Sequence, residues 1–70
     1  MVKVAIKGEY IKLGQFLKLA HLIQSGGEEK TFLLNTPVFV NGKKEQRRGR
    51  KLYPNDKVVV VTKTYLITCE

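Results

Sequence analysis

The sequence predicts an α+β fold in which two short helices pack on a small, mainly antiparallel sheet. Residues 2–7 alternate between apolar and polar side chains, which is typical of a half-buried strand. Apolar residues recur at three- and four-residue steps between Leu13 and Ile23, as in an amphipathic helix. The segment 38–61 contains two valine-rich runs separated by turn residues, which indicates antiparallel strands.

The length and composition allow one domain, spanning residues 1–70. A domain of this size buries only about 60% of the surface that its unfolded chain exposes. The single cysteine, Cys69, cannot close an intrachain disulfide, and the single histidine, His21, has no neighbours with zinc-ligand spacing. The fold must therefore depend on packing, and we expect neither a metal nor another cofactor.

The longest apolar runs reach only four residues, so we expect no membrane span. Residues 1–7 lack the apolar block of a secretory signal. These two features predict a cytoplasmic protein.

Positive charge is the most pronounced feature of the composition. Thirteen Lys and Arg residues against six Asp and Glu residues give a net charge of +7 and a pI near 9.8. Residues 43–51 contain six basic residues and one acidic residue, a local charge of 6 − 1 = +5. This clustering favours a polyanionic partner.

The first helix is predicted to begin with Gly14 as its N-cap. Its apolar stripe extends to Ile23, and its polar side includes Gln15 and Lys18, with Lys12 just ahead of the first turn. These polar residues are expected to face water or a ligand.

The second helix is predicted to begin one or two residues after the first, at a capping box formed by Ser25 and Glu28. Residues 32–34 form its expected buried side, and Asn35 followed by residues 36–37 ends it. Glutamates already occupy its positive end, so Lys30 is the candidate contact if this region meets a polyanion.

The next segment is predicted to be a β-hairpin. Residues 38–40 have strand composition, and Asn41-Gly42 supplies the two positive-φ residues of a type I′ turn. Residues 54–56 form a second turn before the strand 58–61. Residues 64–69 also have strand composition, but no strong turn signal precedes them. The sequence leaves open whether they continue the previous strand or pair with it.

Catalysis is the function class that the sequence supports least. There are no paired carboxylates and no activated nucleophile, which argues against a nuclease or nucleotide hydrolase. Residues 26–31 resemble a phosphate-binding loop only superficially, because their glycine spacing is wrong.

The best candidate site is the run Arg47, Arg48, Arg50 and Lys51, because a guanidinium group presents planar donors that match phosphate oxygens. Lys43 and Lys44 have two equally weighted interpretations, anion contact or protection of a bare sheet edge. Tyr53 has two interpretations, of which packing in the core under the turn is favoured over stacking on a base. No exposed aromatic pair is expected beside the arginines.

Several segments together resemble a known family. They are the first-helix segment 12–18, the cap at Ser25, the Val-Asn-Gly turn at 40–42 and the Arg-Arg-Gly-Arg-Lys-Leu run at 47–52. From about Glu9 to Val61 the chain resembles the S-four RNA-binding domain, named after protein four of the small ribosomal subunit, and most closely its small stand-alone bacterial members. The resemblance implies the αL-type RNA-binding fold and non-catalytic binding of structured RNA, ribosomal or transfer RNA among the candidates.

We therefore expect a monomer that binds hairpin or double-stranded RNA through one basic groove, with no small-molecule substrate and no membrane contact. The predicted RNA-binding residues are Lys12, Gln15, Lys18, Lys30, Lys43, Arg47, Arg48, Arg50 and Lys51. The alternative function is an adaptor that binds an acidic protein in replication or translation. Charge alone also leaves duplex DNA open.

Overall fold

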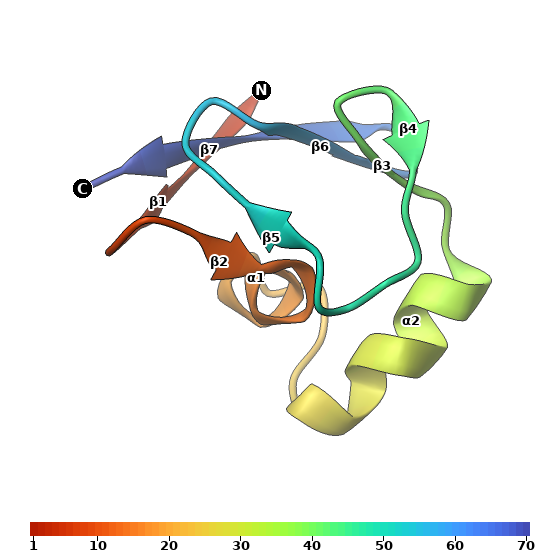
Figure 1. Ribbon diagram of the computed structural model, residues 1–70. Helices are drawn as coiled ribbons and strands as arrows, with labels where there is room; N and C mark the ends of the chain where they lie inside the picture. Colours follow the sequence, from red (N-terminus) through yellow and green to blue (C-terminus); the bar gives the residue numbers. More distant parts are fainter.

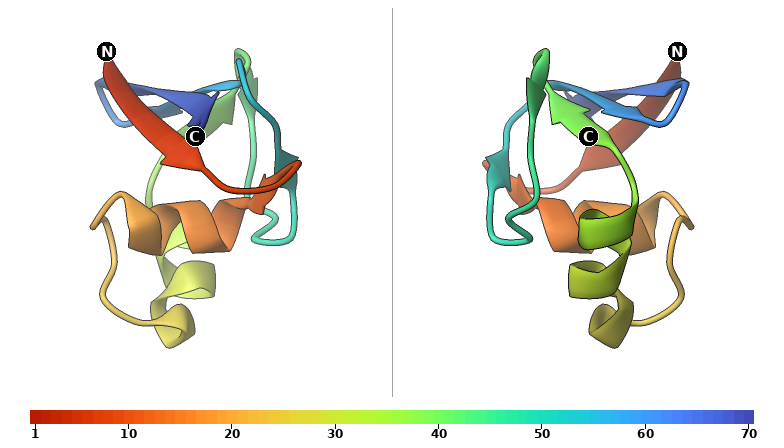
Figure 2. Two further views of the ribbon diagram at one scale, coloured as in Figure 1. Left: turned by 90° about the vertical axis from the view of Figure 1, so that its left-hand side faces the viewer. Right: turned by 90° about the vertical axis from the view of Figure 1, so that its right-hand side faces the viewer.

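The computed structural model describes all residues from 1 to 70 and combines a five-stranded sheet with two helices (Figure 1). Helix α1 lies directly against the sheet, and helix α2 lies on the far side of α1 (Figure 2). The elements in order are β1 (Val2–Ile6), β2 (Ile11–Lys12), α1 (Leu13–Leu19), the 3₁₀ turn η1 (Gly26–Glu28), α2 (Glu29–Asn35), β3 (Val38–Val40), β4 (Lys43–Lys44), β5 (Lys51–Leu52), β6 (Lys57–Val60) and β7 (Lys63–Cys69).

The main sheet has the strand order β1-β7-β6-β3-β4. The β1–β7 pair is parallel, and the other three pairs in this sheet are antiparallel. A second, two-stranded sheet pairs β2 with β5. This arrangement confirms the predicted α+β fold with a mainly antiparallel sheet.

The two predicted features of the 38–61 segment have different outcomes. The Asn41-Gly42 turn is confirmed, because φ is 50° at Asn41 and 86° at Gly42. The predicted strand 58–61 is one residue too long at its end, since β6 stops at Val60 and Val61 lies in a turn with φ 59°. That turn sends β7 back along β6, with Val60 opposite Lys63, which resolves how the C-terminal strand pairs.

Helix α1 is shorter than the apolar stripe predicted. Its N-cap is Lys12 rather than Gly14, and the helix ends at Leu19. His21 has a positive φ of 61°, and its N–H donates to the Lys18 carbonyl at 3.0 Å, while the N–H of Leu22 donates to the Leu17 carbonyl at 2.9 Å. These two bonds form a Schellman motif with histidine at the position that usually holds glycine.

The predicted cap of the second helical segment is confirmed in part. The Glu28 carboxylate accepts the backbone N–H groups of Gln24 and Ser25, each at 3.1 Å. Six residues, rather than one or two, separate the end of α1 from η1. Only Leu33 of the expected apolar side is fully buried, and Leu34 is 60% exposed.

The core lies between the main sheet and α1. The rings of Phe16 on α1 and Tyr65 on β7 meet edge to face, with centroids 5.3 Å apart, a favourable aromatic geometry. No helix is long and apolar enough to span a membrane. The buried apolar residues are Val4, Ile6, Leu13, Phe16, Leu17, Ile23, Leu33, Val38, Val40, Leu52, Val58, Val60, Tyr65 and Ile67.

Candidate nucleic-acid interface

The basic loop between β4 and β5 is bound directly to the first turn of α1. The N–H of Leu13 donates to the Arg50 carbonyl at 2.8 Å, and the N–H of Gly14 donates to the Arg48 carbonyl at 2.9 Å. Helix N-termini leave such amides without intrahelical partners, so the loop carbonyls satisfy them. The loop and the flank of α1 therefore lie side by side, as the sequence predicted.

The short β2–β5 ladder strengthens this contact. Lys12 lies opposite Lys51, and Ile11 lies opposite Leu52. Because directly opposite residues project from the same face of an antiparallel pair, the two lysines add their charges to one surface. Both lysines are exposed.

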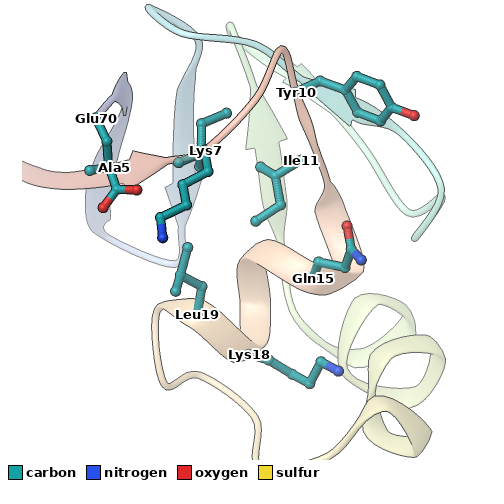
Figure 3. Close-up of a pocket in the computed structure, with 9 residues that line it drawn as sticks. Ala5, Lys7, Tyr10, Ile11, Gln15, Lys18, Leu19 and Glu70 are labelled. Atoms are coloured by element: carbon teal, nitrogen blue, oxygen red, sulfur yellow. The ribbon is translucent and has the colours of Figure 1, made fainter.

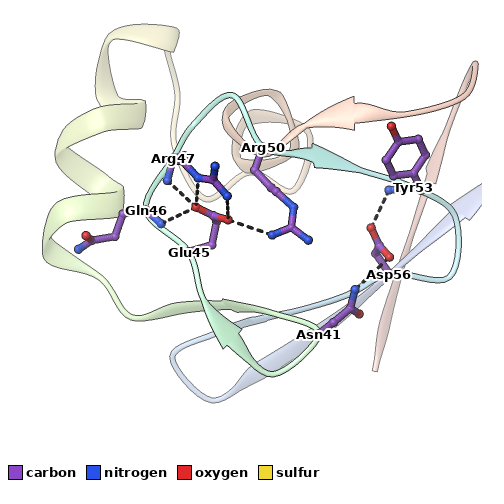
Figure 4. Close-up of polar contacts among 7 residues, drawn as sticks. All are labelled: Asn41, Glu45, Gln46, Arg47, Arg50, Tyr53 and Asp56. Atoms are coloured by element: carbon purple, nitrogen blue, oxygen red, sulfur yellow. Dashed lines mark hydrogen bonds and ion pairs between the residues drawn. The ribbon is translucent and has the colours of Figure 1, made fainter.

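The carboxylate of Glu45 organises the arginines of the loop (Figure 4). Its side chain is only 7% exposed, and it accepts Nε of Arg47 at 2.9 Å, Nη2 of Arg47 at 3.1 Å and Nη1 of Arg50 at 3.0 Å. It also accepts the backbone N–H groups of Gln46 at 3.2 Å and Arg47 at 3.0 Å. Such a set of donors holds both arginine side chains in defined positions.

These contacts lower the pKa of the Glu45 carboxyl group. The side-chain hydrogen bonds from Arg47 lower the pKa of Glu45 from 4.5 to about 2; burial opposes this change, and bonds from the Arg47 backbone and Arg50 add to it. The same pairing raises the pKa of Arg47. Glu45 is therefore ionised throughout the physiological pH range and supports the loop as an internal counter-ion.

This role of Glu45 was not predicted from the sequence. The basic residues of the loop were all expected to be free to bind an external anion. In the structure, Arg47 and Arg50 are partly engaged by a carboxylate of the chain itself. A guanidinium group has five N–H donors. Arg47 uses two of them on Glu45 and Arg50 uses one, so both keep donors for a ligand. Arg48 forms no ion pair and is exposed.

The predicted site residues lie on several elements, and they do not all line one hollow: Arg47, Arg50 and Lys51 line one, and Gln15 and Lys18 line another. Lys18 and Gln15 lie on the outer side of α1, beside an open pocket that Lys7 also lines (Figure 3). The Gln15 side-chain oxygen also accepts the N–H of Lys12 at 3.2 Å. Lys30 lies on α2 and Lys43 on β4, so both lie outside the loop between β4 and β5 and outside α1.

Comparisons with known proteins identify the family. A family model described as the S4 domain matches residues 4–68, which includes most of the first and last strands as well as the segment that carried the resemblance. The chain belongs to the S4 domain family. A Bacillus subtilis (strain 168) relative, "Probable ribosome maturation protein RlbA", is 54% identical over 57 residues, covering 81% of this chain and 80% of the relative. No solved structure matches.

The aromatic residues of this S4 domain correct two expectations. Tyr53 is 47% exposed rather than packed in the core, and Tyr10 is 39% exposed. Their ring centroids lie 5.9 Å apart with the planes at 49°, so an exposed aromatic pair does lie beside the arginines. The pair forms because β2 and β5 pair, a long-range contact that no local pattern indicates.

No group of three or more His, Cys, Asp or Glu side chains is placed to hold a metal ion. Cys69 is a free, exposed cysteine. His21 is exposed, and its contribution to the fold is the backbone conformation that ends α1.

Proposed function

We propose that this S4 domain binds structured RNA, in hairpin or double-stranded form, and catalyses no reaction on it. The observation that supports the proposal most is the pair of backbone hydrogen bonds from Leu13 and Gly14 to the loop carbonyls, at 2.8 and 2.9 Å. They hold the arginine loop against the first turn of α1, and we propose that the two segments together form one RNA-binding surface, which we name the basic groove. Its members are Lys12, Gln15, Lys18, Arg47, Arg48, Arg50 and Lys51.

The chemistry of the basic groove suits a phosphate backbone. Glu45 holds Arg47 and Arg50 in place in the free protein, so less side-chain entropy is lost when they meet a ligand. The three groups together still carry a net charge of 2 − 1 = +1. Double-stranded RNA is recognised mainly through its shape, its phosphates and its 2′-hydroxyls, which matches a rigid surface of this kind.

Ribosomal RNA is the ligand that we propose within this class, because the name of the Bacillus subtilis relative refers to ribosome maturation. The proposal places the protein in the cytoplasm as a monomer. It assigns no RNA-binding role to Lys30 or Lys43, because they lie on α2 and β4 rather than on α1 or the arginine loop.

A salt titration with an RNA hairpin tests the proposal. If four to six phosphates are neutralised, log affinity falls against log salt with a slope of about −3 to −5. Replacing both Lys12 and Arg48 by alanine should reduce the magnitude of the slope by about 2 and weaken binding at low salt. Arg48 is preferred to Arg47, whose removal would leave the buried Glu45 short of a partner.

The matched control is the double replacement of Lys3 and Lys63 by alanine, which removes the same charge from residues beside a different hollow of the surface. This control should leave the slope nearly unchanged. If both double variants change the salt dependence and the affinity equally, binding depends only on the net charge of the protein, which would contradict a defined site.

Two further outcomes distinguish other partners. Competition between matched RNA and DNA hairpins should favour RNA, because the 2′-hydroxyl and the A-form shape separate the two. Recovery of a protein partner from cells after thorough ribonuclease digestion, together with failure to bind the RNA hairpin, would support the acidic-protein adaptor instead.

A further inference from the structure

Tyr10 and Tyr53 form an exposed aromatic pair directly beside the basic groove. Their rings, 39% and 47% exposed, are 5.9 Å apart, and the β2–β5 ladder that follows Tyr10 and precedes Tyr53 fixes their spacing. The Lys51 ammonium lies 4.8 Å from the centre of the Tyr10 ring, a cation–π contact. One face of Tyr10 is therefore occupied by a cation, whereas no such contact is made to Tyr53, which is the more exposed of the two rings.

Tyr53 lines an open hollow of about 600 Å³ whose two ends differ in chemistry. Arg47 and Arg50 lie at one end, and Tyr53 and Asp56 lie at the other (Figure 4). The Asp56 carboxylate accepts the Tyr53 N–H at 2.8 Å and Nδ2 of Asn41 at 3.1 Å. Its charge disfavours a phosphate beside Tyr53 and leaves the arginine end as the place for one.

We propose that Tyr53, supported by Tyr10, stacks on the base of an unpaired nucleotide that flanks the RNA helix, while Arg50 and Lys51 contact its phosphate. The proposal rests on RNA binding by the basic groove and narrows the ligand to a junction between paired and unpaired RNA. The proposal assigns one base to the Tyr53 ring. Stacking on an aromatic ring tolerates any base, because every base has a π face, so this contact selects an unpaired position rather than a sequence.

The test compares the same RNA hairpin with a blunt end and with two unpaired nucleotides at its 3′ or its 5′ end. Stacking of one base on an aromatic ring strengthens binding by between about five- and a hundredfold. The wild-type protein should therefore bind one of the extended hairpins more tightly than the blunt hairpin by a factor in this range. A 2-aminopurine placed at the unpaired position should lose fluorescence when it stacks.

Tyr53→Phe and Tyr53→Leu form the matched pair of variants. Phenylalanine keeps the aromatic face and should keep both the affinity gain and the loss of fluorescence, whereas leucine should lose both while binding the blunt hairpin as the wild type does. Because the side chain is half exposed, both variants should melt at nearly the wild-type temperature.

An affinity gain that persists unchanged in Tyr53→Leu would overturn the stacking proposal while leaving RNA binding intact. Equal affinity of the wild type for blunt and extended hairpins would do the same. Failure of the wild type to bind any of the hairpins would instead overturn the proposed function itself, so the two failures are distinguishable.

Discussion

Replacing Glu45 by glutamine should destabilise the fold and remove part of its acid sensitivity. The substitution keeps the size of the side chain but removes the charge that accepts Arg47 at 2.9 Å and Arg50 at 3.0 Å. Two guanidinium groups then lose their counter-ion. Charge-assisted hydrogen bonds are about twice as strong as neutral ones, and the amide of glutamine cannot replace both.

The size of the effect follows from the titration of the carboxyl. A fall of its pKa from 4.5 to about 2 corresponds to about 3 kcal/mol at most. Arg47 is 76% exposed, so solvent screens part of the attraction, and about 2 kcal/mol is the expected loss. For a domain of this length, that loss lowers Tm by about 8–16 °C.

Thermal melting of both proteins between pH 7 and pH 2 measures this contribution. Because the pKa is lower in the folded state, the stabilisation is complete above pH 4.5 and is lost as pH falls from 4.5 towards 2. The difference in Tm between wild type and variant should therefore be largest near neutral pH and small near pH 2. Glu9→Gln is the matched control, because Glu9 is exposed and forms no ion pair. A difference that stays constant across this range would refute the role assigned to Glu45.

Two further substitutions test the fold. Val61→Gly should raise stability by about 1 kcal/mol in urea unfolding, because a β-branched residue at φ 59° is strained and glycine is not; Val61→Ala should give a smaller change, and a loss of stability with glycine would contradict the assigned conformation. Phe16→Ala should cost about 3–5 kcal/mol, because the ring is fully buried against Tyr65. That is a large part of the stability of a small domain, so circular dichroism should show a weak or absent cooperative transition, and a melt close to that of the wild type would contradict the packing.

The local patterns of the sequence predicted the elements well where one signal determines the structure. The alternation in residues 2–7 identified β1, and Asn41-Gly42 identified the hairpin because two adjacent positive φ values need such residues. The basic run and the α1 flank were correctly placed together. That placement came from the family resemblance, since composition does not reveal which segments meet.

The errors are of two kinds: some concern the local conformation and contacts of single residues, and others concern contacts between distant segments. His21 and Val61 adopt positive φ, although neither residue type signals a turn, so the end of α1 and the turn before β7 were both missed. Glu45 appeared to be a minor acidic residue in a basic run, yet folding buries it between two arginines. Tyr53 was misplaced because its partner Tyr10 lies across a strand pair that only the fold creates.

The parallel pairing of β1 with β7 determines when parts of the chain can fold during synthesis. Val2 lies opposite Tyr65, so β1 has no parallel partner in the sheet until the chain has grown by more than sixty further residues. Contacts between such distant positions form late, because closing a long loop costs conformational entropy before the contact contributes any favourable free energy. The helices and the Asn41-Gly42 hairpin can form early. The edge strand β1, which carries the buried Val4 and Ile6, joins the sheet only after β7 has been synthesised.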